Sequence, residues 1–181
     1  MMITSIWKKK ISEEKVANIF INTVLELVQS TFADVAEVIN SDPEFVSRPN
    51  ISERDSDKFL MIILSGNLKM LSQHFEEGKD DKVREHIYPK LAKVFGMEEK
   101  ALRGIISDYQ SYMSRINYPS KNTHYAMSKA VFYKYNLNAF QKEYFKNLDT
   151  PNPVFLKHLD ELVEQFIINW EDFQEKYKVT D

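Results

Sequence analysis

The chain has 181 residues, of which 43% are hydrophobic and 28% are charged, with a formal net charge of −3 and no cysteine. This composition suits one folded domain with a substantial core and excludes a disordered chain. The charge excludes a generally basic nucleic-acid binder, and the lack of cysteine excludes disulfides, thiolate metal sites and a cysteine nucleophile.

The N-terminal residues do not have the pattern of a secretory signal. Lys8–Lys10 follow the few apolar residues instead of preceding them, and no long apolar stretch comes after. The longest uninterrupted apolar run has six residues, whereas a membrane-spanning helix requires roughly 20. We therefore expect a soluble cytoplasmic protein without membrane contact. Residues 1–181 are expected to form a single domain, with 1–11 as a candidate flexible N-terminal arm.

The first predicted helix begins after Ser12, a favourable N-cap residue, and its apolar residues recur at helical spacing to about residue 29. The same pattern continues over 32–39. This stretch is either a second helix or a continuation of the first after a bend at Ser30–Thr31. The pattern stops before Pro43, because the residue before a proline is disfavoured in the α region.

After a loop over 44–54, the segment 55–75 is the most apolar stretch of the chain. Read at 3.6 residues per turn, it has two apolar faces, and a helix that is apolar on both sides belongs in the middle of a bundle. One face carries Leu60, Leu64, Leu68, Leu71 and Phe75, and the other carries Phe59, Ile63 and Met70. We predict that this helix ends near Gly78 and that the other helices surround it.

Five further helices are predicted in the second half of the chain, over 80–96, 97–116, 123–135, 139–148 and 153–177. Pro89 predicts a kink or a restart in the first of these, and Gly104 predicts a close approach to a neighbouring helix. Asn152–Pro153 is the clearest helix start. No segment alternates between apolar and polar residues, so we predict no β-sheet. The expected fold class is all-α, a single irregular bundle of about six to eight helices with the 55–75 helix at its centre.

The histidines and carboxylates do not form a recognisable metal motif. No two histidines are three or four residues apart, and none has a glutamate three residues before it, as a di-iron carboxylate bundle requires. The chain also lacks a nucleophile elbow, a phosphate-binding loop and a dinucleotide fingerprint. We therefore expect no metal and no cofactor, and we favour a non-catalytic protein over an enzyme.

Residues 89–106 have the skeleton of a helix-turn-helix, with Gly96 at the turn. Lys100 and Arg103 are the residues that would contact DNA, but Glu98–Glu99 open the same helix and would repel phosphate. An ordinary corner between two helices has the same pattern, and we favour that interpretation.

A second basic segment lies between 121 and 146, where lysines alternate with aromatic residues. Lys129, Lys134 and Tyr133 are its candidate residues for contact with nucleic acid or an anion, because basic and aromatic side chains together favour such ligands. The predicted helix 153–177 is acidic, so the two segments could also pair with each other or face solvent.

Asn67 and His74 are polar residues on the apolar 55–75 helix. A buried asparagine needs hydrogen-bond partners, so Asn67 either bonds to a facing helix or lines a small pocket near His74.

The leading hypothesis is a non-catalytic cytoplasmic interaction or regulatory module that binds a protein partner or itself. One alternative is a helical-bundle protein that binds a small ligand near Asn67 and His74. The other is a DNA-binding regulator that uses residues 89–106.

Overall fold

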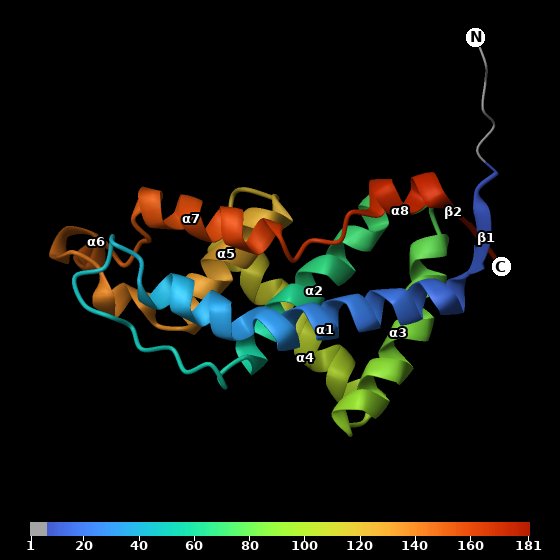
Figure 1. The fold of residues 1–181 in the computed structure, drawn as a ribbon, viewed down its shortest axis with the longest axis horizontal. Helices are drawn as coiled ribbons and strands as arrows, with labels where there is room; N and C mark the ends of the chain where they lie inside the picture. Colours follow the sequence, from blue (N-terminus) through green and yellow to red (C-terminus); the bar gives the residue numbers. More distant parts are fainter. Residues whose placement is uncertain (1–6) are drawn as a thin grey trace, which may run out of the picture.

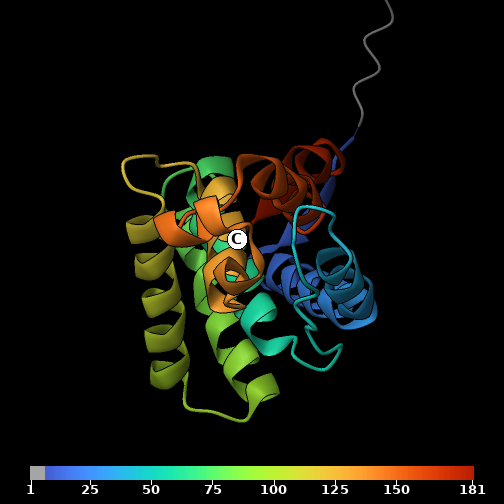
Figure 2. The same ribbon diagram turned by 90° about the vertical axis from the view of Figure 1, so that its left-hand side faces the viewer.

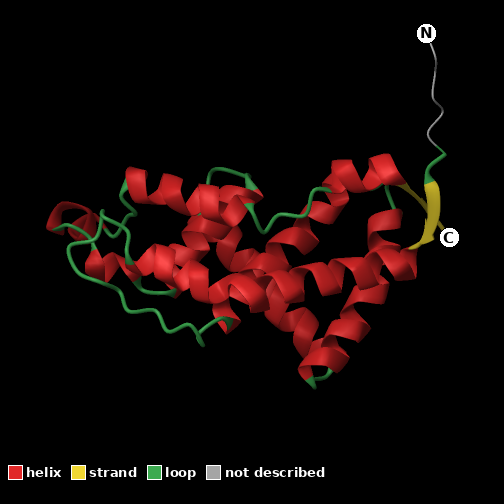
Figure 3. Ribbon diagram, in the orientation of Figure 1, coloured by secondary structure: helices red, strands yellow, loops and turns green. Residues whose placement is uncertain are grey.

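The computed structural model describes residues 7–181 and confirms the all-α helical bundle (Figures 1 and 3). Residues 1–6 of the candidate N-terminal arm lie outside the described part. The helices are α1 (Glu13–Asn40), α2 (Asp57–His74), α3 (Lys79–Phe95), α4 (Glu99–Ile116), α5 (Thr123–Lys134), the 3-10 helix η1 (Leu137–Phe140), α6 (Glu143–Leu148), α7 (Pro153–Glu164) and α8 (Trp170–Lys176).

The apolar helix α2 lies at the centre of the bundle, as predicted. It contacts α1, α3, α4 and α5, and both of its apolar faces are buried. In Figure 2, α4 and α1 lie on opposite sides of the molecule, with α2 and α5 between them. Gly66 permits the contact of α2 with α5, because a Cβ at this position would clash with the Met127 side chain.

Helix α1 is one continuous helix, without a bend at Ser30–Thr31. The hydroxyl groups of both residues donate to backbone carbonyls one turn earlier, Ser30 to Glu26 and Thr31 to Leu27, each at 2.7 Å. These side chains therefore fit within the helix instead of interrupting it.

The structure confirms the role predicted for Gly96, but not those predicted for Gly78 and Gly104. Gly96 ends α3 in the left-handed conformation, as the corner requires, and Pro89 is accommodated inside α3 without a restart. Gly78, however, does not end α2, which stops at His74; it precedes α3 with a φ of 87°. Gly104 does not permit a close approach, since no atom lies within 4 Å of a Cβ placed there.

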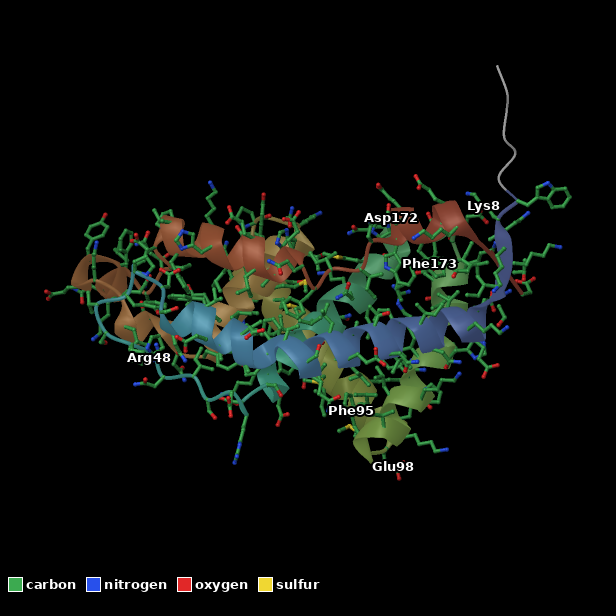
Figure 4. All side chains as sticks on the ribbon, in the orientation of Figure 1. Lys8, Arg48, Phe95, Glu98, Asp172 and Phe173 are labelled. Atoms are coloured by element: carbon green, nitrogen blue, oxygen red, sulfur yellow. The ribbon has the colours of Figure 1, made fainter. Side chains whose placement is uncertain are left out.

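The predicted helix 153–177 is wrong as a single helix, because it is divided into α7 and α8 by residues 165–169. Asn67 of α2 stabilises the break. Its Oδ1 accepts from the Ile168 amide and its Nδ2 donates to the Phe166 carbonyl, both at 2.9 Å. In α8, Phe173 points toward the body of the molecule and Asp172 points outward (Figure 4).

The prediction of no sheet is also wrong. Strands β1 (Lys9–Ser12) and β2 (Tyr177–Thr180) pair in parallel, with Lys9 opposite Tyr177, and form a small sheet at one end of the molecule (Figure 3). Each strand has four residues, too few for an alternating pattern to be recognisable in the sequence.

Candidate functional site

A groove of about 610 Å³ lies between the second half of α1 and α7. It exists because the two helices belong to different parts of the bundle: α1 packs mainly on α3, and α7 packs mainly on α5 (Figure 1). Leu27, Thr31, Asp34, Val35 and Val38 form the α1 wall, and His158, Glu161, Leu162, Gln165 and Phe166 form the opposite wall. On both helices the lining residues follow steps of three and four, so each helix contributes one face.

The floor of the groove is apolar. Val35, Leu162 and Phe166 are buried, Leu27 is half-buried above them, and the side chain of Val38 is 53% exposed at the edge. An exposed valine beside a row of buried apolar residues leaves apolar surface accessible in a concave place. Concave surfaces lined largely by apolar side chains are where ligands and partner segments bind.

The charged residues around the groove are acidic. Asp34 and Glu161 are exposed on opposite walls, and none of the described residues that line the groove is lysine or arginine. The nearby loop carries Arg48, labelled in Figure 4, but this guanidinium bonds to Glu37 with an Nη2–Oε2 distance of 2.5 Å. The hydrogen bond from Arg48 lowers the pKa of Glu37, so this pair adds no free positive charge near the groove.

One end of the groove is closed by a contact between His158 and Asp42. The His158 Nδ1 lies 2.7 Å from Asp42 Oδ2, and Asp42 Oδ1 accepts from the Glu44 amide. A carboxylate that orients a histidine is also part of hydrolytic triads. Here the two hydroxyls in the groove donate to backbone carbonyls instead, Thr31 to Leu27 and Ser41 to Glu37. The geometry therefore serves to hold α7 against the end of α1.

The structure places Asn67 and His74 in different surroundings. Asn67 is fully buried and, besides its bonds to 166–168, donates to the Ile63 carbonyl at 2.9 Å. Asn67 thereby positions Phe166 on the groove floor. His74 is half-buried and lines a separate cleft of about 390 Å³ next to β2, where its carbonyl accepts from Gln174.

In the corner between α3 and α4, the side chain of Arg103 is bonded within the protein. Its guanidinium donates to Glu99 at 2.8 Å and to Glu85 at 3.1 Å, and it lies 4.1 Å from the centre of the Tyr88 ring. Lys100 is exposed. The corner therefore offers two exposed lysines, Lys93 and Lys100, with the acidic Glu98 and Glu99 between them, and this mixed charge is a poor surface for phosphate.

The candidate residues of the 121–146 segment lie on or beside α5, which packs between other helices. Lys134 lies over the rings of Tyr109 and Tyr112, with Nζ 4.9 and 4.4 Å from their centres. The Tyr133 hydroxyl donates to the Asp149 carbonyl at 2.9 Å, and Lys129 is half-buried. Much of the aromatic content of this segment thus serves packing within the protein.

Among residues 7–181, α1 is the one helix that is long and apolar enough to cross a membrane by length and composition. Its apolar face is buried against the rest of the bundle. No group of three or more possible metal ligands occurs in the same described part of the chain.

No sequence pattern indicates the groove, because its two walls are more than 100 residues apart in the chain. The only local signal was Val38, which lies outside the buried stripe of α1. No protein-family model, curated protein or solved structure matches this chain.

Proposed function

We propose that this protein is a non-catalytic interaction module and that the groove between α1 and α7 is its docking site. The proposed occupant is a basic amphipathic helix of a partner protein. One observation carries the proposal: the groove has an apolar floor, and the exposed charged residues that line its two walls, Asp34 and Glu161, are both acidic.

The dimensions of the groove favour a helix as its occupant. From Leu27 to Val38, the α1 wall extends over twelve residues, or about 16 Å from the first to the last at 1.5 Å per residue. That length accommodates about three turns of a bound helix. Helices that bind in grooves present apolar residues at positions i, i+3, i+4 and i+7, which would lie along this floor.

The charges favour lysine or arginine on both flanks of the bound helix. Asp34 and Glu161 face the groove from opposite sides, so a helix with basic residues on either side of its apolar face would meet a carboxylate on each. Exposed pairs of this kind contribute mainly to association rate and orientation, while the apolar floor supplies most of the affinity. We infer that the module works in the cytoplasm, which agrees with a chain that contains no cysteine.

Binding of a synthetic Leu/Lys amphipathic helix of about four turns, measured by fluorescence anisotropy, tests the proposal. Val38→Lys places a charge in the groove, and Val94→Lys is its matched control because Val94 is a similarly exposed valine on α3 (59% against 53%). We expect Val38→Lys to weaken binding about tenfold or more, and Val94→Lys to leave it unchanged.

The acidic walls are tested with Asp34→Lys, for which Asp108→Lys on the exposed face of α4 is the control. Asp34→Lys should weaken binding and reduce its dependence on salt. Equal binding by all four variants and the wild type would refute the docking site. If sedimentation shows a dimer that Val38→Lys disrupts and Val94→Lys does not, the occupant is a second copy of the chain instead of a partner.

A further inference from the structure

The small sheet leaves one edge of β1 unpaired. Its two strands pair only with each other, and no other backbone hydrogen bond among residues 7–181 involves Lys9, Lys10 or Ile11. Figure 1 shows β1 at one end of the molecule, where α1 begins; the groove between α1 and α7 (the α1–α7 groove) lies along the other half of α1. An unpaired strand edge presents N–H and C=O groups that can pair with a further strand.

The exposed side chains at this edge are basic. Lys8, Lys9 and Lys10 follow one another, and all three are exposed. None of them forms an ion pair within the described part of the chain. In the sheet, Lys10 lies opposite Lys178, and like charges in opposite positions destabilise a sheet. The carboxylates of a partner would neutralise this local excess of positive charge in a chain whose net charge is −3.

A cleft of about 290 Å³ lies between β1 and the start of α1, and we name it the β1 cleft. Three consecutive residues of β1 line it, together with Tyr177 and one face of α1: Lys9, Lys10, Ile11, Lys15, Asn18 and Ile19. The described residues that line the cleft thus include three lysines and no carboxylate. Ile19 contributes apolar surface, since it is 37% exposed. The β1 cleft therefore offers an apolar contact surrounded by positive charge.

The alternation of side chains along β1 determines which sequence would fit beside it. Lys10 is exposed on one face of the strand, next to Lys178, and Ile11 is buried on the other face. A strand added at the free edge would place its successive side chains alternately on these two faces. The complementary sequence therefore alternates carboxylates, on the face of Lys10, with apolar residues, on the face of Ile11.

A second copy of the chain is an unfavourable occupant of this edge. Pairing of β1 with the β1 of another copy would bring lysines next to lysines, and lysines on edge strands commonly prevent such self-association. The same side chains attract an acidic strand, so the charge of the edge selects a partner of opposite charge.

We propose that the free edge of β1 binds an extended acidic segment of a partner protein, which adds a third strand to the sheet. The backbone of the segment pairs with the backbone of β1, and its carboxylates lie beside Lys10 and Lys8. An apolar side chain of the segment enters the β1 cleft and contacts Ile19. In this mode of recognition the main-chain hydrogen bonds supply affinity, and the side chains supply specificity.

The test measures binding of an alternating Glu/Val peptide of about six residues, the length of an ordinary strand, to the whole protein by fluorescence anisotropy. We expect saturable binding, and we expect hydrogen exchange to show that β1 amides gain protection. A Lys/Val peptide of the same length should not bind. A Glu/Val peptide with a central proline keeps the charge but lacks one backbone donor, so it should bind about tenfold more weakly.

Two substitutions with matched controls locate the site. Lys10→Glu should weaken binding of the Glu/Val peptide about tenfold, whereas Lys100→Glu, at an exposed lysine of α4, should not. Ile19→Asp should also weaken binding, and Ile105→Asp is its control because Ile105 is a similarly exposed isoleucine of α4 (36% against 37%). Val38→Lys should keep full affinity for the Glu/Val peptide, so failure at the α1–α7 groove is distinguishable from failure here.

The proposal is overturned if the Glu/Val peptide does not bind, or if the Lys/Val or the proline peptide binds equally well. It is also overturned if binding leaves the β1 amides unprotected, or if Lys10→Glu and Ile19→Asp bind like the wild type while circular dichroism shows both folded. A single-stranded DNA oligonucleotide that displaces the peptide and binds more tightly would assign the edge to nucleic acid, and a dimer that Lys10→Glu abolishes would assign it to a second copy. Either result would contradict the proposal.

Discussion

Replacing Asn67 with alanine should destabilise the junction between α7 and α8, although Asn67 lies about 100 residues away in the chain. Residues 165–169 interrupt what the sequence presents as one helix, and Asn67 bonds to this segment through two backbone groups, the Phe166 carbonyl and the Ile168 amide. Asn67→Ala removes both bonds at once.

The size of the effect follows from those two groups. An unsatisfied buried backbone group costs about 1–3 kcal/mol, so two of them set a range of about 2–6 kcal/mol. Ile168 is only half-buried and water can reach it, so we expect a loss in unfolding free energy of about 3 kcal/mol. For a protein of this size, that corresponds to a decrease in Tm of about 6–12 °C.

Urea denaturation and thermal melts followed by circular dichroism will measure this loss, with Asn147→Ala as the control. Asn147 is an exposed asparagine of α6 that should change stability by less than about 0.5 kcal/mol when replaced. Hydrogen exchange should also show the Ile168 amide losing its protection in Asn67→Ala. A variant less than 1 kcal/mol below the wild type, with the Ile168 amide still protected, would refute the role assigned to Asn67.

Four further substitutions test the packing and the electrostatics of the bundle. Asp80→Asn should destabilise by about 1–2 kcal/mol at neutral pH, because the hydrogen bond from Arg84 (2.5 Å) lowers the pKa of Asp80. In urea titrations this difference should vanish as the pH falls through that lowered pKa; a difference independent of pH would contradict it. Asp160→Asn should instead stabilise the protein at neutral pH, because burial raises the pKa of Asp160. The variant should be more stable than the wild type above the usual aspartate pKa and equally stable below it. A variant that is less stable than the wild type at neutral pH would refute this. Gly104→Ala should raise the stability measured in thermal melts by up to about 1 kcal/mol. Gly66→Ala should not, because its Cβ would clash with Met127 of α5. If Gly66→Ala were the more stable of the two variants, the packing described for both glycines would be wrong.

The parts of the fold that the sequence predicted correctly are those with local causes. The position of α2 follows from its two apolar faces, and the starts of α1 and α7 follow from the caps Ser12 and Asn152, whose side chains accept from the Lys15 and Val154 amides. These signals lie within one or two turns of the residues that they organise, so a single sequence contains them.

The parts that were missed depend on distant residues. Phe166 and Trp170 are four residues apart and both buried, so the apolar stripe continues through the break between α7 and α8. The cause of the break is Asn67, about 100 residues away in the chain. The β1–β2 pairing joins the two ends of the described chain, and the α1–α7 groove needs two helices whose neighbours hold them apart. No local pattern reports such arrangements.

The sequence likewise could not show which charged residues are free to form a site, because their partners lie on other helices. Arg103 was a candidate for DNA contact because it follows a helical turn, but Glu85 on the preceding helix shares its guanidinium with Glu99. Thr123 was recognised as part of a helix start, and Lys121 as part of a basic segment. Only the fold brings them together with Lys69 of α2, around a cleft of about 450 Å³ at the turn between α4 and α5.

The central claim is that the groove between α1 and α7 binds a basic amphipathic helix. A map of amide chemical-shift changes during titration with the Leu/Lys helix tests it most directly, with a Leu/Glu helix of the same length as the comparison. We predict that the Leu/Lys helix shifts the amides of the groove walls, around Thr31–Val38 and His158–Phe166, and that the Leu/Glu helix does not. Shifts that scatter over the surface, that centre on α3 and α4, or that are the same for both peptides would contradict it.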